Sequence, residues 1–389
     1  MTCRSQARVL MKKRSKLKRL LINGCIAFFV AIILLETVEL YLHLTYKAGE
    51  PEPFAFSPVL GWENVPGLNI TFYSPYYGRD IREVHNSLGI RDVREFGNKT
   101  KPRILIIGDS FVYGWGLDQQ DIIGRRLQEK LPGYEVISAG TTGYSTTQYM
   151  QEYDNRTRVL HPDIVVFAVS IDDFAQNFYD SMFGFTKPWD YAVTLNGTVA
   201  RRDFSPKPIV RRPLPAPTFI LPSLIIPPVN AKKTPELYAS SSLRISHALY
   251  MLEQPLVIVP GEENIPGVII TSNILEWYVL NETNAKLLHD NATFVVAYIP
   301  ARIQADPYYR ADVFSNYTDV PVSTLNCTAP DEYLRIMTLN LNIAYLDLLP
   351  ALSIEPENDY LPDSHLSPSG TARFDEELYG LLVKEKLIH

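Results

Sequence analysis

The feature that most constrains the fold is a short stretch, residues 104–111, in which four β-prone apolar residues run directly into Gly108-Asp109-Ser110. A continuous apolar run of this kind is typical of a strand that is buried on both faces of a parallel sheet. The glycine permits a tight turn at the strand's carboxyl end, the edge at which open α/β sheets bind their ligands. Ser110 could therefore raise its hydroxyl above the sheet as a nucleophile, beside unpaired backbone N–H groups. The alternative is that Ser110 only caps a helix.

The rest of the chain repeats this alternation of short strands and helical stretches. Strands are expected over residues 103–107, 134–138, 163–169, 292–300 and 343–348. Helices are expected over residues 119–131, 145–160, 236–252, 270–289, 331–340 and 368–387. Strands separated by helices indicate βαβ units, so the sequence predicts an α/β fold with a five-stranded parallel sheet.

Two other segments depart from this alternation. Residues 45–100 are rich in Pro, Tyr and Gly, and their segment 86–92 is expected to dock ahead of the first core strand. Residues 178–235 carry many prolines, concentrated between Pro206 and Pro228. We expect an irregular insertion packed on the ligand end of the sheet, the alternative being a flexible linker between two domains.

The N-terminus is strongly basic and leads into an apolar run. Residues 1–19 hold eight Lys or Arg and no acid, and residues 20–35 are mostly apolar. An extension to residue 44 would place Glu36 and Glu39 near the membrane interface, and no small residues suited to signal-peptide cleavage follow. The pattern predicts a basic cytoplasmic tail over residues 1–19, a single transmembrane signal anchor over residues 20–44 and an extracytoplasmic body. The alternative is an amphipathic helix on the membrane surface.

Sequons for N-glycosylation support this orientation. Eight of the 19 asparagines begin an N-x-T sequon, and none has proline in the middle position. Such an excess is typical of a glycoprotein domain outside the cytoplasm, although a host without this modification would leave the sites unused. The candidate sites are Asn69, Asn98, Asn155, Asn196, Asn281, Asn291, Asn316 and Asn326.

Charge and cysteine content argue against several other classes. Beyond residue 19 the chain carries 29 Lys or Arg against 43 Asp or Glu, which argues against nucleic acid as a partner. Cys3 and Cys25 fall in the predicted tail and anchor, which leaves Cys327 alone in the body. The body can therefore form no internal disulfide and no cysteine-based metal site. We expect no metal and no cofactor.

Two of the seven histidines stand two residues after an acid, His85 after Glu83 and His365 after Asp363. His365 follows the last predicted strand, in a loop rich in turn formers, and is the better candidate for catalysis. In an extended segment, positions i and i+2 point to the same side, so Asp363 could orient the imidazole. A serine, a histidine base and an orienting acid are the parts of a hydrolase triad.

Four short motifs occur along the chain in the order Gly108-Asp109-Ser110, Gly140-x-x-Gly143, Ser170–Asp173 and Asp363-x-His365. In order and spacing they resemble the four marker blocks of the SGNH (GDSL-type) hydrolases. The resemblance covers roughly residues 85–389 and extends to membrane-anchored members, which carry similar Pro-rich insertions. It implies a flavodoxin-like three-layer α/β/α domain over residues 101–389.

Carried across residue by residue, the resemblance implies ester hydrolysis or acyl transfer with Ser110 as the nucleophile. His365 would be the base and Asp363 the acid that orients it. The backbone N–H groups of Ser110 and Gly143 would stabilise the oxyanion. The third block normally supplies an asparagine side chain as a further oxyanion donor, and here that position is Asp172. The D-x-H spacing of the last block is a variant found within the family.

An ionised carboxylate cannot donate a hydrogen bond, so Asp172 puts the third oxyanion donor in doubt. Asp172 could be protonated, it could turn away from the site, or the protein could be inactive as an enzyme. The favoured function is a membrane-anchored serine esterase acting on acyl esters of surface glycans or lipids. O-acyl transfer to a glycan, a catalytically silent glycan-binding or assembly protein and, more remotely, flavin binding are the alternatives.

Overall fold

The computed structural model describes residues 22–24, 26–38, 53–74, 77–179, 181–194, 196–206, 265–317 and 326–389, with only the helical backbone for residues 265–271 and 315–317. Residues 22–24 and 26–38 are helical. Across these ranges, no helix combines the length and the apolar character that spanning a bilayer requires. The predicted basic tail over residues 1–19 lies outside the described residues, as do both ends of the predicted anchor.

A five-stranded sheet forms the centre of the body, and every neighbouring pair of its strands is parallel. Its spatial order is β13-β12-β7-β5-β6. The strands are β5 (Arg103–Gly108), β6 (Glu135–Gly140), β7 (Ile164–Ser170), β12 (Thr293–Ile299) and β13 (Ala344–Asp347). Counted along the chain this is the order 2-1-3-4-5 of flavodoxin-like sheets, so the α/β class and the five-stranded parallel sheet are confirmed.

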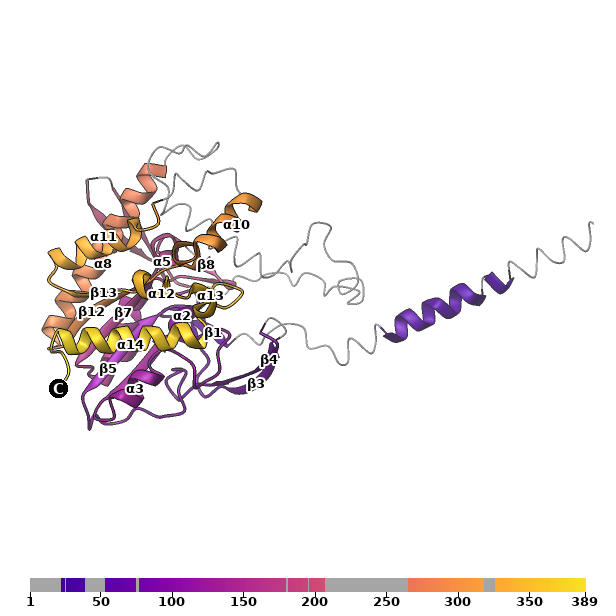
Figure 1. Ribbon diagram of the computed structural model, residues 1–389, viewed down its shortest axis with the longest axis horizontal. Coiled ribbons are helices and arrows are strands. Elements are labelled where there is room, and N and C mark those ends of the chain that lie inside the picture. The colour runs from indigo at the N-terminus through magenta and orange to yellow at the C-terminus, as the bar shows by residue number, and fades with distance from the viewer. Residues whose placement is uncertain are drawn as a thin grey trace, which may run out of the picture. The chain divides into compact units, whose positions relative to one another are not determined.

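Helices cover both faces of the sheet and make a three-layer structure. Leu105 and Ile107 of β5 belong to one hydrophobic core, whereas Ile104 and Ile106 belong to the other, as the alternation of side chains along a strand requires. The first core is completed by α4 (Thr146–Glu152), α8 (Ile265–His289) and α11 (Ala329–Asn340). The second is completed by α3 (Arg125–Lys130) and α14 (Pro368–Lys384), which cross the near face of the sheet in Figure 1.

Short helices complete the connections between these elements. After α4 the chain continues through a π-helical turn (Tyr153–Thr157) and a 3₁₀ turn (Arg158–Leu160). The other helices of the described body are α2 (Ser110–Tyr113), α5 (Ile171–Gln176), α9 (Arg302–Ala305), α10 (Pro307–Tyr317), α12 (Leu349–Leu352) and α13 (Pro356–Asp359). The expected strands and most expected helices agree with the structure to within a few residues.

The helix expected over residues 119–131 is wrong in its first half, because the regular helix α3 begins only at Arg125. Gly124 precedes it in a left-handed conformation (φ 89°), where a Cβ would lie 2.4 Å from the Ser138 hydroxyl oxygen. The N-terminus of α3 is satisfied by a distant residue, since the Asp375 carboxylate accepts the N–H groups of Gly124, Arg126 and Leu127. A cap from α14 leaves no local signal in the sequence of α3.

The segment ahead of the core strands forms two hairpins, β1 (Phe54–Ser57) with β2 (Gly61–Asn64), and β3 (Asn69–Ser74) with β4 (Arg79–Val84). The Asn64 side chain donates to the Gly140 carbonyl at 2.8 Å, which ties β2 to the end of β6. The buried Arg91 guanidinium donates to four backbone carbonyls, three of them in residues 113–117. Residues 86–92 therefore dock against the chain that follows β5.

The start of the predicted insertion is more regular than expected. Two hairpins occupy it, β8 (Ser181–Met182) with β9 (Phe185–Thr186), and β10 (Trp189–Val193) with β11 (Val199–Asp203). Met182 and Phe183 pack directly over Gly143, at the carboxyl end of β6. Residues 207–264, including the helix expected over residues 236–252, lie outside the described residues.

Candidate active site

The proposed nucleophile, Ser110, is the first residue of α2, directly after β5. Its hydroxyl does not cap the helix, because Asp109 is the N-cap and its Oδ1 accepts the N–H of Phe111 at 2.8 Å. Asp109 thus stabilises the turn that presents Ser110. A Cβ on Gly108 would lie 2.2 Å from the Val112 side chain, so the tight turn requires glycine.

Ser110, His365 and Asp363 form one hydrogen-bonded row. The Ser110 Oγ lies 2.9 Å from His365 Nε2, and His365 Nδ1 lies 2.9 Å from Asp363 Oδ2. All three residues are less than a tenth exposed. Ser110 and His365 are 255 positions apart in sequence, and they meet where β5 lies between β6 and β7, the point at which the strand order reverses.

The protons in this row suit base catalysis. An ionised Asp363 only accepts, so it holds the proton of the imidazole on Nδ1 and leaves the lone pair of Nε2 facing the serine hydroxyl. Nε2 can then take the Ser110 proton, and the carboxylate stabilises the imidazolium that results.

The backbone around His365 differs from the extended segment expected from the sequence. Residues 361–365 form a turn, closed by hydrogen bonds between Leu361 and His365 and between Ser364 and Leu361. Ser364 adopts a left-handed conformation with φ 71°. The turn, rather than the alternation of a strand, brings the side chains of Asp363 and His365 together.

The two other predicted oxyanion residues follow β6 and β7, the two strands that flank β5. Gly143 follows β6 with φ 73°, a conformation that a residue with a Cβ would strain. Asp172 lies in the first turn of α5, directly after β7, and is buried. Its neighbour Asp173 has a structural role: it accepts from the Ser170 N–H and the Tyr149 hydroxyl, and burial raises its pKa well above the usual value.

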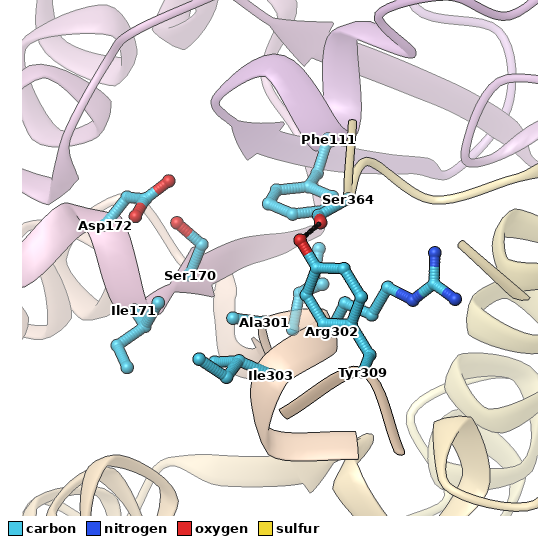
Figure 2. A pocket seen from close by; sticks show the side chains of 10 residues that line it. Phe111, Ser170, Ile171, Asp172, Ala301, Arg302, Ile303, Tyr309 and Ser364 are labelled. Carbon is cyan, nitrogen blue, oxygen red and sulfur yellow. Dashed lines mark hydrogen bonds between the residues drawn. The ribbon is translucent and has the colours of Figure 1, made fainter. Parts of the chain in front are cut away.

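A small pocket is lined by residues next to the triad in sequence. In Figure 2, Ser170, Ile171 and Asp172 line one side of it, and Arg302 and Tyr309 line the other. The remaining lining residues are Phe111, Ile299, Ala301, Ile303 and Ser364. Phe111 follows Ser110 in sequence and Ser364 precedes His365, so the pocket is lined by the direct chain neighbours of two triad residues. Its lining is mainly apolar.

Sequence reasoning missed several residues of the site. The lining residues between Ile299 and Tyr309 follow β12 and carry no polar motif; the only signal was that β12 ends at the same edge of the sheet. Tyr77, whose hydroxyl donates to Asp363, comes from the β3–β4 turn. Of the aromatic residues near Ser110 that could stack on a sugar, Tyr113 and Tyr144 are buried packing residues, whereas Trp115 is half-buried with its ring 6.5 Å from that of His365.

The sequence matches no protein-family model and no curated protein. It is similar in structure to the psychrotrophic esterase EstA from Pseudoalteromonas sp. (10% identity, 74% of this chain and 100% of that chain, TM-score 0.38). It is also similar to a GDSL-like lipase from Bacteroides thetaiotaomicron (9% identity, 75% and 93%, TM-score 0.37) and to the acetyl xylan esterase AlAXEase (13% identity, 72% and 98%, TM-score 0.37). Identities and TM-scores this low assign no chemistry to this chain, whose chemistry rests on the geometry of its own site.

Proposed function

We propose that the chain is a serine esterase that hydrolyses acyl esters through an acyl-enzyme intermediate on Ser110. The observation that carries the proposal is the unbroken row of hydrogen bonds from Ser110 through His365 to Asp363, placed at the switch point of the sheet. An isolated loop histidine would not need a buried carboxylate on one ring nitrogen and a buried serine hydroxyl on the other.

In the proposed reaction, Ser110 Oγ attacks the ester carbonyl carbon while His365 Nε2 takes its proton. The tetrahedral intermediate collapses as His365 returns that proton to the leaving alcohol oxygen, which leaves the acyl group on Ser110. A water then attacks the acyl-enzyme with His365 again as the base. The backbone N–H groups of Ser110 and Gly143 are the proposed oxyanion donors, and the adjoining pocket is proposed to receive the acyl group.

We further propose that the enzyme is anchored through residues 20–44 and acts outside the cytoplasm, on acyl esters of surface glycans or lipids. The eight sequons and the basic N-terminus support this location. The side chains of Asn69, Asn98, Asn155, Asn196 and Asn291 are exposed, and those of Asn281 and Asn326 are half-buried. The side chain of Asn316 lies outside the described residues.

Replacing Ser110 tests the proposed function directly. The Ser110→Ala variant should lose labelling by a fluorophosphonate probe, and its kcat on a short-chain aryl ester should fall by at least roughly a thousandfold. Ser353→Ala, which alters an exposed serine far along the chain, should behave like the wild type. Turnover above about a tenth of wild type in a folded Ser110→Ala variant would contradict the assignment. A wild type that is neither labelled nor active would favour a silent binding protein, and product analysis with an added sugar would separate hydrolysis from acyl transfer.

A further inference from the structure

We propose that Tyr77 is a positioning residue of this site, one that holds the Asp363 carboxylate against His365; the inference rests on the proposed esterase function. The Tyr77 hydroxyl donates to Asp363 Oδ2 at 2.5 Å. The same oxygen receives the Nδ1–H of His365 at 2.9 Å, while Oδ1 receives the His365 backbone N–H at 3.2 Å. The hydrogen-bonded row thus continues from Ser110 through His365 and Asp363 to Tyr77.

The loop after α2 is shaped to receive the Tyr77 ring. Gly116 adopts φ 76°, and a Cβ there would lie 2.2 Å from the ring carbon Cζ and 2.6 Å from the hydroxyl oxygen. Arg79, two residues after Tyr77, donates from its guanidinium to the Gly116 carbonyl at 3.0 Å. A glycine with positive φ and a second contact from the same hairpin hold the ring in place, so the hydrogen bond to Asp363 is built into the fold.

This bond should act on both the orientation and the basicity of Asp363. A carboxylate that accepts a further hydrogen bond is a weaker base, so Tyr77 reduces the pull of Asp363 on a proton at His365. Without the hydroxyl, the His365 imidazolium becomes more stable in the resting enzyme, and His365 is available as a base only at higher pH. The carboxylate also loses one of the contacts that fix its plane, and misplacement of a catalytic group slows the chemical step.

Other ionisable groups near this row come from several elements. Arg79 belongs to β4, Asp172 to α5, and Arg302 and Tyr309 lie beside Ser364. The Tyr77→Phe substitution changes none of these groups and keeps the aromatic ring packed against Gly116. A change in the titration of His365 in this variant therefore reports the lost hydroxyl.

The experiment compares Tyr77→Phe with Tyr73→Phe in the full chain. Tyr73 belongs to the same hairpin, is 62% exposed and serves as the matched control. We expect kcat of Tyr77→Phe to fall about tenfold with little change in KM. The acidic limb of its kcat/KM–pH profile should move up by about half a unit to one unit, and Tyr73→Phe should leave both unchanged. The His365 titration, followed by ¹⁵N NMR, should move in the same direction.

The NMR titration separates this inference from the proposed function. If the wild type hydrolyses the ester and Tyr77→Phe matches it in kcat and pH profile, Tyr77 has no positioning role and the esterase assignment stands. If the wild type is inert, the esterase assignment fails, and the His365 titration alone decides whether Tyr77 acts on the pair. An unchanged His365 titration in folded Tyr77→Phe overturns the inference in either case.

Discussion

At the scale of single residues, Asp172 is the position at which this site departs most from an oxyanion hole built of donors. Asp172 is only 4% exposed, and it lines the same pocket as Phe111 and Ser364 (Figure 2). An ionised carboxylate there accepts hydrogen bonds but donates none. Two unit charges about 4 Å apart repel by roughly 4 kcal/mol at an effective dielectric constant near 20, so a nearby carboxylate would oppose a developing oxyanion.

Replacing Asp172 with asparagine removes the charge and adds an N–H donor of nearly the same shape. Since one oxyanion donor is worth about 10²–10³ in rate, we expect Asp172→Asn to preserve kcat near neutral pH or to raise it by up to that factor. Asp172→Ala removes the charge without adding a donor, and its kcat should not exceed that of the Asn variant. Steady-state kinetics on an aryl ester, with circular dichroism to check the fold, measure both. A large fall in kcat in folded Asp172→Asn would mean that the carboxylate itself is required.

Among the elements, the segment ahead of β5 and helix α2 share a buried group of hydrogen-bonded polar side chains. The Tyr113 hydroxyl lies 2.9 Å from Glu83 Oε2 and 3.1 Å from His85 Nε2, and His85 Nδ1 lies 2.8 Å from the Val65 carbonyl. A carbonyl only accepts, so His85 carries its proton on Nδ1. The Tyr113 hydroxyl donates its one proton to Glu83, and the bare Nε2 of His85 lies beside the same hydroxyl oxygen. Burial lowers the pKa of His85 to about 4 and raises the pKa of Glu83. His85, the second histidine with a nearby acid, thus packs as a neutral core residue behind α2.

The depressed pKa of His85 predicts a loss of stability in acid. Below pH about 6.5 His85 is protonated in the unfolded chain, whereas in the folded chain it stays neutral down to pH about 4. The contribution of His85 to the free energy of unfolding therefore falls by roughly 3 kcal/mol as the pH drops through this range. The His85→Gln variant has no imidazole at this position, so its free energy of unfolding lacks this acid-dependent decrease. The difference in unfolding free energy between wild type and variant should therefore shrink as the pH falls from 7 to 4, whatever its size at pH 7.

Denaturant unfolding at several pH values measures this difference. His289→Gln, at a histidine whose side chain is 80% exposed, is the matched control and should differ little from wild type in pH dependence. The raised pKa of Glu83 acts with the opposite sign, and because it is present in both proteins it largely cancels in the comparison. A His85→Gln variant whose pH dependence parallels that of the wild type would show that His85 titrates normally in the folded protein.

At the scale of the whole molecule, the proposed location predicts a definite pattern of protection and modification. None of the seven sequon side chains that the structure describes is buried, so the folded surface can carry glycans at these positions. With the chain inserted into sealed vesicles, added protease should trim only the N-terminal tail, and a glycosidase should lower the apparent mass of the protected body. Thr71→Ala and Thr100→Ala each remove one sequon and serve as controls for single glycans. Complete digestion of the body in sealed vesicles would overturn the proposed orientation.

The central sheet and the residues that could carry the chemistry were predictable from the order of amino acids. A buried parallel strand is a continuous apolar run, so β5, β7 and β12 could each be predicted from their own residues. The alternation of strands and helices then restricted the fold to the parallel α/β class. The turn after β5 was also predictable, because Gly108 and Asp109 determine it through contacts with residues next to them in the chain. Ser110, His365 and Asp363 were recognisable as residue types in motifs, and the structure brings them within hydrogen-bond distance.

The contacts between side chains far apart in sequence were not predictable in this way. Tyr77 reaches Asp363 across 286 positions, and the carboxylate of Asp375 caps α3 across about 250. Neither contact has a local periodicity or a capping signal that reasoning along the chain could detect. The pocket residues that follow β12 and the left-handed Ser364 belong to the same class. Their roles arise from packing between elements. The contacts that stabilise them come from residues distant in sequence, so the residues beside them in the chain do not predict them.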